Sequence, residues 1–307
     1  MMQKNNKNIF FKNISKIKKK AVNIIIIFIL TLFAFIFTFP MLFTVFNSFM
    51  SNEEIEGKYS VAAINNYAQQ TGTDEHFMCI SLIPDEVTFK QYYIILIEKT
   101  QYLVMFWNSI KIVLPVICGQ IIVACMAAYA FTLLKFRGKD YLFFIYIVVM
   151  LMPFQVTLVP NYIVAAKLNL VGSYLSIIFP GIFNTFGVFL LRQYISYIPS
   201  TYMEAAKMDG ANCWNIFINI IVPMSKTGIA ALAILTFIDN WNMVEQPLIF
   251  IKDALKEPLS IYLSTLNEKE TGISFAASVF YMLPMLLSFL YWEDYLVEGI
   301  ELSGIKA

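Results

Sequence analysis

Six long apolar stretches limit this chain to very few kinds of fold. Five contain no charged residue and one contains two acids; they cover residues 21–46, 112–134, 141–166, 174–191, 227–251 and 273–292. A bilayer core of about 30 Å is crossed by about 20 apolar residues in a helix. The stretches are continuous rather than alternating, which favours helices over the strands of a barrel. The sequence therefore predicts an all-α integral membrane protein with six transmembrane helices.

The composition points to the same class of protein. Charged residues make up 14% of the 307 residues, against about 25% in soluble domains. Hydrophobic residues reach 59% and the mean hydropathy is +0.66. A soluble fold could not cover this much apolar surface with so few charges. The formal net charge of +1 gives no sign of nucleic-acid binding, so membrane lipid is the expected surrounding.

Lysine residues indicate the orientation of the predicted helices. Residues 1–20 hold seven lysines and no acid, which makes them a basic tail on the cytoplasmic side. The stretch at 21–46 is too long for a cleaved signal peptide and is predicted to remain as an anchor. Residues 47–106 then form an extracytoplasmic loop, residues 107–292 the core transmembrane domain and residues 293–307 a tail. With six crossings, both termini are cytoplasmic.

The segment between the fourth and fifth stretches contains residues that typically begin and end helices. Thr201 and Glu204 have the spacing of a capping box, which predicts that a helix begins there. Gly210, next to Asp209, is expected to end this helix, because glycine adopts the left-handed backbone conformation at little cost. Asn212 can cap a second short helix, and Pro223 is expected to break it. The prediction is two short helices joined at a glycine, lying at the inner membrane surface.

The same segment carries a longer pattern: Glu-Ala-Ala, then a glycine after three residues, then Ile-x-aliphatic-Pro after nine more. The residues in register are Glu204, Ala205, Ala206, Gly210, Ile220, Val222 and Pro223. Residues 199–223 therefore resemble the "EAA" loop of ATP-binding-cassette (ABC) importer permeases. Over residues 105–307 the chain is similar to the carbohydrate branch of that family, the maltose-type permease with six spans. Further matching pieces are Asn108-Ser109, Ala127-Ala128-Tyr129-Ala130-Phe131 and Trp241-Asn242.

The resemblance implies the fold of a type I ABC importer permease and a transport function. In that family the helix of the loop docks on a separate ATPase, so the implied coupling residues are Glu204, Ala205, Ala206, Asp209, Gly210 and Pro223. The implied partners are a homologous permease subunit that completes a heterodimer, an ATPase dimer that binds ATP and Mg²⁺, and an extracytoplasmic solute-binding protein that residues 252–272 would reach. The chain itself would bind no cofactor. Its implied location is the bacterial cytoplasmic membrane.

Polar residues inside three of the stretches are candidates for the translocation path. The fifth stretch contains most of them, and the third and fourth add one each; the set is Asp239, Asn240, Trp241, Asn242, Glu245, Gln155 and Asn184. A charge at the bilayer centre costs about 2.5–3.5 kcal/mol on insertion scales, so it usually faces protein or water. Carboxylates and amides bind sugar hydroxyls, and a tryptophan ring stacks on the C–H face of a sugar. The alternative is that these groups only hold the helices together.

Three classes of function follow from these observations. The motif favours a permease subunit that forms half of the path of an ATP-driven importer, for a carbohydrate such as an oligosaccharide or for a glycerophosphate-type solute. No G-x-x-x-x-G-K-[ST] run occurs, so ATP hydrolysis would reside on a partner chain. A membrane enzyme is disfavoured because His76 is the only histidine. A self-sufficient secondary transporter is disfavoured because the sequence shows no internal repeat.

The four cysteines indicate neither a disulfide framework nor a metal site. Cys118 and Cys125 lie in one apolar stretch, seven residues apart. Cys79 and Cys213 fall in segments that are predicted to lie on opposite sides of the bilayer. We therefore expect four unpaired thiols.

Overall fold

The computed structural model describes residues 2–59, 81–264 and 271–304, and the side chains of residues 19–59, 81–264 and 271–295. His76 and Cys79 lie outside the described residues. Every regular element among the described residues is helical, so the prediction of an all-α protein is confirmed.

The chain divides into two compact units. One consists of residues 1–91 and 270–279, and the other of residues 92–269 and 280–307. Helix α16 (Thr271–Gly304) contributes its first residues to the first unit and the rest to the second. The two units are described separately below.

The first unit is built on one long helix. α1 (Met2–Asn47) contains both the basic tail and the first apolar stretch, so the predicted boundary at residue 20 is not a break in the helix. Its part from Lys19 to Asn47 is long and apolar enough to cross a membrane. The Phe43 ring packs edge-on against Tyr59 and against Phe275, with 5.9 Å between ring centroids in both pairs.

The described part of the predicted extracytoplasmic loop is largely helical. It holds α2 (Asn52–Tyr59), α4 (Lys90–Tyr93), the π-helix η1 (Ile94–Glu98) and the first turns of α5 (Thr100–Leu133). Near α2, Lys58 Nζ lies 2.9 Å from Asp85 Oδ2 and 2.6 Å from Glu54 Oε1. Hydrogen bonds to these two carboxylates, that to Asp85 first, raise the pKa of the Lys58 ammonium above its ordinary value. The pair with Glu54 lies within α2, and the pair with Asp85 ties α2 to residues 81–89 of the same unit.

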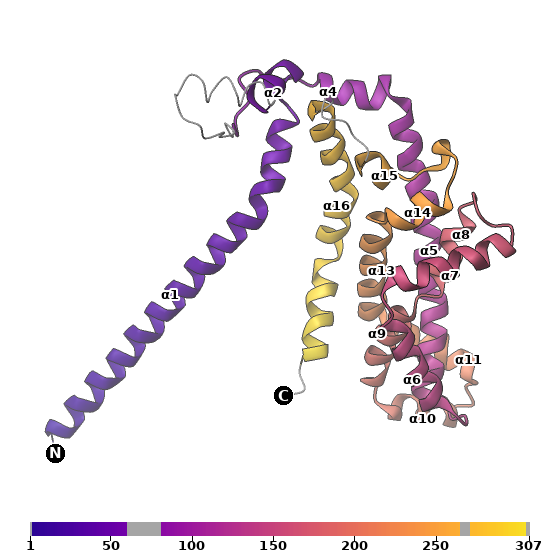
Figure 1. Ribbon diagram of the computed structural model, residues 1–307. Coiled ribbons are helices and arrows are strands. Elements are labelled where there is room, and N and C mark those ends of the chain that lie inside the picture. The colour runs from indigo at the N-terminus through magenta and orange to yellow at the C-terminus, as the bar shows by residue number, and fades with distance from the viewer. Residues whose placement is uncertain (1, 60–80, 265–270, 305–307) are drawn as a thin grey trace. The chain divides into compact units, whose positions relative to one another are not determined.

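The second unit is organised around α5, which packs against α8 (Leu175–Ile182), α9 (Thr185–Ser196) and α13 (Lys226–Trp241), as Figure 1 shows. The helix begins at Thr100, well before the apolar stretch predicted from residue 112. A Cβ on Gly187 of α9 would lie 2.9 Å from Gln120 Nε2 of α5, so glycine permits this close approach. Gln120 Oε1 accepts a hydrogen bond of 2.9 Å from Thr236 Oγ1 of α13. The three helices therefore meet at a buried polar pair.

The third and fourth apolar stretches are interrupted rather than continuous. α6 (Lys139–Met150) and α7 (Phe154–Lys167) meet at 103°, and Pro153 is the N-cap residue of α7. Proline has no N–H to donate and disfavours a helical residue before it, so α6 must end ahead of it. The fourth stretch is interrupted between Ile182 and Thr185, where α8 ends and α9 begins.

The fifth stretch ends earlier than predicted. α13 stops at Trp241, and a separate helix, α14 (Glu245–Phe250), follows it. One continuous helix over residues 227–251 is therefore wrong. Before α13 lie α10 (Ser200–Met208), α11 (Cys213–Ile216), the π-helix η2 (Phe217–Ile221) and α12 (Val222–Met224). After α14 come the 3-10 helix η3 (Ala254–Lys256) and α15 (Leu259–Ser264).

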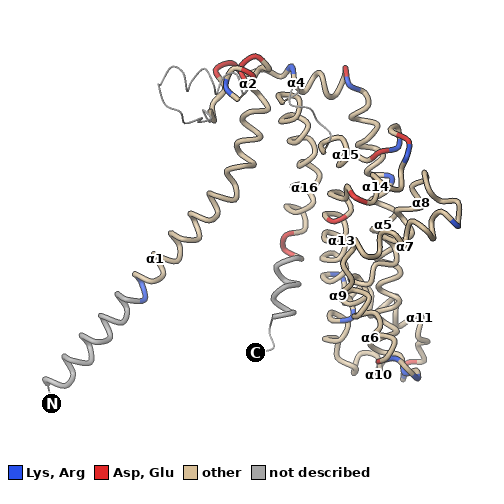
Figure 2. Tube along the Cα trace, viewed as in Figure 1, with Lys and Arg blue, Asp and Glu red and all other residues tan. Residues whose placement is uncertain are grey.

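Among the described residues, four helices are long and apolar enough to cross a membrane, and up to six crossings result if each sharply bent helix pair counts as one. Six crossings and the orientation of the termini therefore stay predictions. α16 continues past residue 292 to Gly304, so the predicted C-terminal tail begins inside a helix. Figure 2 shows Lys and Arg gathered in the second unit where α6 begins and α10 lies.

Candidate functional site

The segment from α10 to α12, residues 200–224, is called the α10–α12 unit here. Its first helix ends at Gly210, whose φ of 83° lies in the left-handed region. The Gly210 N–H donates to Lys207 O at 3.1 Å, and the Ala211 N–H donates to Ala206 O at 2.9 Å. These two bonds form a Schellman motif and satisfy carbonyls that the helix end leaves open. The predicted role of Asp209-Gly210 as the helix end is confirmed.

The start of α10 differs from the prediction. The N-cap residue is Pro199, and no side chain caps the helix. Thr201 and Glu204 are both exposed and do not form the predicted capping box. Proline explains the difference, because its fixed φ already sets the entry of the chain into the helix and leaves the side chains free.

The second helix begins as predicted and ends differently. Asn212 Oδ1 accepts a hydrogen bond of 2.8 Å from the Asn215 N–H, so the predicted cap is confirmed. Pro223 lies inside α12, and the chain turns by 72° after it, around Ser225. The prediction that Pro223 itself breaks the helix is therefore wrong. α11, η2 and α12 follow one another without a break, so Pro223 lies near the end of one helix, just after its π-helical turn.

The α10–α12 unit has one buried side and one exposed side. Met203, Ile216 and Ile221 are buried in a hydrophobic core that also contains residues of α5, α6 and α9. Glu204, Ala205 and Asp209 are exposed, whereas Ala206 is half-buried against the core. The unit therefore combines a helix that ends in a Schellman motif with one face anchored in the core.

Two exposed apolar side chains on this unit were missed from the sequence. Met208 is 87% exposed at the last turn of α10, and Trp214 is 56% exposed on α11. Large apolar groups that stay outside the core commonly mark a surface for another protein. The signal was available, because Met203 and Met208 are five residues apart and cannot lie on one helix face.

Trp241 lies in the core instead of facing a path. Its ring is 1% exposed and stacks on Phe237, with centroids 5.3 Å apart. Tyr281 of α16 covers it at 5.8 Å, and Phe106 of α5 packs against it at 5.7 Å. The expectation that Trp241 stacks on a sugar is therefore wrong for this structure, because protein rings already cover the indole.

The break between α13 and α14 is held by residues from distant parts of the chain. Trp241 Nε1 donates to Tyr281 O at 3.2 Å, and Tyr281 Oη donates to Trp241 O and Asn242 Oδ1, both at 2.9 Å. Ser260 Oγ of α15 donates to Met243 O at 2.6 Å. Backbone groups freed where a helix breaks in a membrane need such partners. Asn242 thus helps to hold the break in place.

The remaining predicted path residues have mixed environments. Gln155 Nε2 of α7 donates to Glu245 Oε2 of α14 at 3.5 Å, so the structure brings these two together. Asn240 Nδ2 donates to Thr236 O within its own helix. Asn184 Oδ1 accepts a 2.9 Å hydrogen bond from the Phe186 N–H and so caps α9. The two roles considered from the sequence were binding of a solute in the path and association of helices, and this cap is neither.

Asp239 differs from the other predicted path residues because its side chain makes no hydrogen bond or ion pair with a described residue. Asp239 is also exposed. A carboxylate in an apolar helix usually faces water, a solute or other protein groups rather than lipid.

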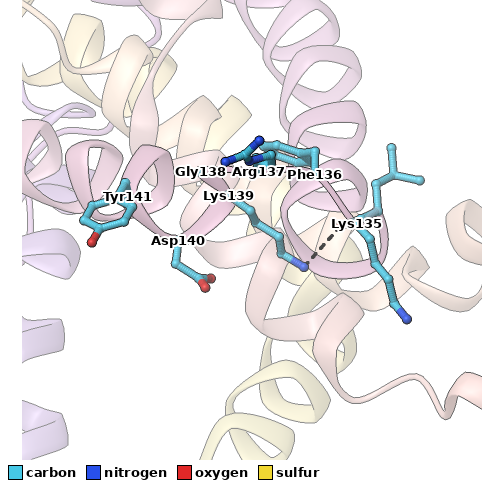
Figure 3. A pocket seen from close by; sticks show the side chains of 8 residues that line it. Lys135, Phe136, Arg137, Gly138, Lys139, Asp140 and Tyr141 are labelled. Carbon is cyan, nitrogen blue, oxygen red and sulfur yellow. Dashed lines mark hydrogen bonds between the residues drawn. The ribbon is translucent and has the colours of Figure 1, made fainter.

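An open hollow of about 540 Å³ lies beside the α5–α6 connection, lined by residues 134–141 (Figure 3). Lys139 Nζ donates to Thr132 O at 2.9 Å and to Leu134 O at 3.4 Å, so this lysine caps the end of α5. Lys135 and Arg137 are exposed. None of the predicted site residues lies in this hollow.

Comparison with known proteins identifies the family. Residues 120–301, more than half of the chain, match the family described as "Binding-protein-dependent transport system inner membrane component". This chain belongs to that family. It is therefore a membrane-embedded transport subunit, and the predicted resemblance to importer permeases is confirmed, whereas the coupling role of residues 199–223 stays a prediction.

Individual relatives agree with this assignment. The arabinooligosaccharides transport system permease protein AraQ of Halalkalibacterium halodurans is 29% identical over 226 residues, which cover 73% of this chain and 81% of that protein. The sn-glycerol-3-phosphate transport system permease protein UgpE of Pectobacterium atrosepticum is 30% identical over 208 residues, which cover 66% of this chain and 74% of that protein. The chain is similar to permease subunits of both kinds.

A solved structure supports the fold. The chain is similar, with a TM-score of 0.73 and 21% identity, to a chain in the crystal structure of a bacterial ABC transporter involved in the import of the acidic polysaccharide alginate. The match covers 90% of this chain and 96% of that one. The fold is thus that of an ABC importer permease.

Proposed function

We propose that this permease takes force from a separate ABC ATPase dimer through the α10–α12 unit. The observation that carries the proposal is the exposed, capped helix α10, in register with the importer loop and anchored on one face. The contact residues are Glu204, Ala205, Ala206, Asp209 and Gly210, joined by Met208. Pro223 lies in α12 and therefore belongs to the α10–α12 unit, but it is not one of the contact residues. ATP and Mg²⁺ belong to the ATPase.

The proposed orientation places the α10–α12 unit in the cytoplasm. The connection from α5 to α6 carries Lys135, Arg137 and Lys139, and it lies at the same end of the second unit as α10. Basic residues in short connections favour the cytoplasmic side. Both termini then lie inside the cell, and the membrane is the bacterial cytoplasmic membrane, crossed six times.

The proposed complex contains three further kinds of protein. A second, homologous permease completes the path, because one chain of this size supplies only half of it. An extracytoplasmic solute-binding protein delivers the solute to the opposite end, where residues 252–258 lie. The family description, which names binding-protein-dependent transport, supports this partner.

The proposed solute is an oligosaccharide. The AraQ relative, named for arabinooligosaccharides, supports this class. Asp239, Asn240, Asn242, Glu245 and Gln155 supply the carboxylates and amides that bind sugar hydroxyls. Trp241 has no part in this proposal because it is buried.

A glycerophosphate-type solute is the second candidate, and the UgpE relative favours it. Titration of the purified cognate binding protein with arabinooligosaccharides and with sn-glycerol-3-phosphate separates the two. Binding of the oligosaccharide alone supports the first candidate, and binding of the phosphate ester alone replaces it with the second.

The coupling proposal is tested by Gly210→Val in the reconstituted complex. Valine in the left-handed conformation costs about 1–2 kcal/mol, so the end of α10 should change and uptake should be lost while the chain stays in the membrane. Gly138→Val is the matched control, because Gly138 also has a φ of 83° and open space around its Cβ position. Equal uptake by both variants would contradict the proposal.

A further inference from the structure

One end of α5 holds the loop between α14 and α15. Asn108 Nδ2 donates to Leu255 O at 2.8 Å and to Glu257 O at 3.1 Å. Ser109 Oγ accepts a bond of 2.9 Å from the Leu259 N–H. Both anchoring residues are 2% exposed, so these bonds form away from water. The loop is thus fixed to α5 by three hydrogen bonds.

The loop presents an exposed group on this rigid support. Asp253 Oδ1 accepts a bond of 3.1 Å from the Leu255 N–H and caps η3. The Leu255 side chain is 68% exposed. The connection between α7 and α8 is attached next to this loop, because the Gly172 N–H donates to Phe250 O, at the end of α14, at 2.8 Å.

The other end of α5 holds the α10–α12 unit. Tyr129, which is 9% exposed, donates from its hydroxyl to Cys213 O at 3.1 Å. Its ring packs against Phe217, with 5.2 Å between centroids. Cys213 is the first residue of α11, so the bond fixes the start of the second helix of the unit.

The two attachments lie on one continuous helix. From Asn108 to Tyr129, α5 advances by 21 residues as one helix that contains Pro115, or about 32 Å at 1.5 Å per residue. That length is close to the thickness of a bilayer core, about 30 Å. The helix also packs against α8, α9 and α13 over this length, which limits its bending.

We propose that Asn108, Ser109 and Tyr129 are positioning residues through which α5 sets the distance between the external loop and the α10–α12 unit. The inference rests on the proposed function, in which the loop faces the binding protein and the unit faces the ATPase. A movement of the loop then reaches the unit through one helix, because each end is hydrogen-bonded to the element it must move. Neither end acts on the solute directly.

The test uses the full complex of both permeases, ATPase dimer and binding protein in liposomes. Asn108→Leu and Tyr129→Phe each remove hydrogen bonds; Tyr129→Phe keeps the ring, and Asn108→Leu keeps the branched shape with a larger side chain. Tyr129→Phe should lower the stimulation of ATP hydrolysis by the binding protein by about fivefold, the effect of about one net hydrogen bond, and Asn108→Leu, which removes two bonds, by at least as much, with basal hydrolysis and assembly unchanged. The double variant should lose no more of this stimulation than the more strongly affected single variant, because loss of either attachment already uncouples the loop from the α10–α12 unit.

The controls separate this inference from ordinary structural damage. The Tyr146 ring packs against Phe131 of α5, and its hydroxyl has no partner among the described residues. Tyr146→Phe removes only this hydroxyl, so the variant should show the same stimulation as the original protein. Ser109→Ala is the milder variant if Asn108→Leu does not assemble. Unchanged stimulation in the variants, or losses that multiply in the double variant, would overturn the inference. A complex of original subunits without any stimulation would instead overturn the proposed function.

Discussion

The α10–α12 unit and the break between α13 and α14 are both short and irregular and both pack on other helices, but different hydrogen bonds set their backbone shape. Gly210 and Asn212 shape the first through hydrogen bonds that span at most five residues along the chain. The second is held by Tyr281 of α16 and Ser260 of α15, which lie 40 and 17 residues from their partners.

This difference bears on how each region can move. A unit whose turn and second helix start are shaped by local hydrogen bonds keeps that shape when it is pushed, which suits a part that transmits force. A break held by neighbouring helices changes whenever those helices shift, which suits a part that opens and closes a path. The predictions below test this contrast, beginning with the largest expected effect.

The largest effect is expected from the two tryptophans, one in each region. Trp241→Ala removes a buried ring and should lower the free energy of unfolding by about 3–5 kcal/mol. Trp214→Ala removes a ring that is 56% exposed and should change it by about 0.5 kcal/mol or less. Thermal unfolding in detergent, followed by circular dichroism, measures both.

The same pair of variants separates stability from function. Trp214→Ala should weaken binding of the ATPase although the chain stays folded, because Trp214 belongs to the exposed side of the α10–α12 unit. Equal destabilisation by the two substitutions would mean that the Trp214 ring also stabilises the fold by packing, and its assignment to an exposed contact surface would be lost.

A smaller effect on the fold is expected from Asp239→Asn. The carboxylate has no partner among the described residues, so its removal should leave the amount of folded protein nearly unchanged. Uptake should fall by about tenfold, as expected for one hydrogen bond from a solute to a charged group. Transport of radiolabelled solute, normalised to the protein in the membrane, gives the answer.

The control for Asp239 is Asp294→Asn on α16, which also removes one exposed carboxylate. It should retain normal uptake. Parallel losses of uptake and of membrane protein in Asp239→Asn would assign the residue to helix association, the alternative role considered from the sequence.

The contrast also explains what could be predicted from the sequence. The end of α10 at Gly210 and the cap at Asn212 were predicted correctly because each depends on residues a few positions away. The starting residue of α10 was missed because Pro199 and the capping-box pair compete for the same turn. Pro153 explains why α6 ends before it, but the angle of 103° depends on what α6 and α7 pack against.

The path region shows why the remainder could not be predicted. The end of α13 at Trp241 depends on Tyr281, 40 residues away, and no local pattern reports such a pair. Burial of Trp241 follows from rings on α5, α13 and α16. Of the polar residues proposed for the path, Gln155 and Glu245 were brought together, whereas Asn184 was used as a helix cap.

The most direct test of the central claim uses Cys213, an exposed free thiol on α11. In a variant that keeps only this cysteine, the rate of maleimide labelling is measured with and without the ATPase dimer. A second variant carries its only cysteine at position 257, in the external loop, as the control. The account predicts that the ATPase slows labelling of Cys213 and leaves labelling at position 257 unchanged. Equal labelling of Cys213 in the presence of stably bound ATPase would contradict it.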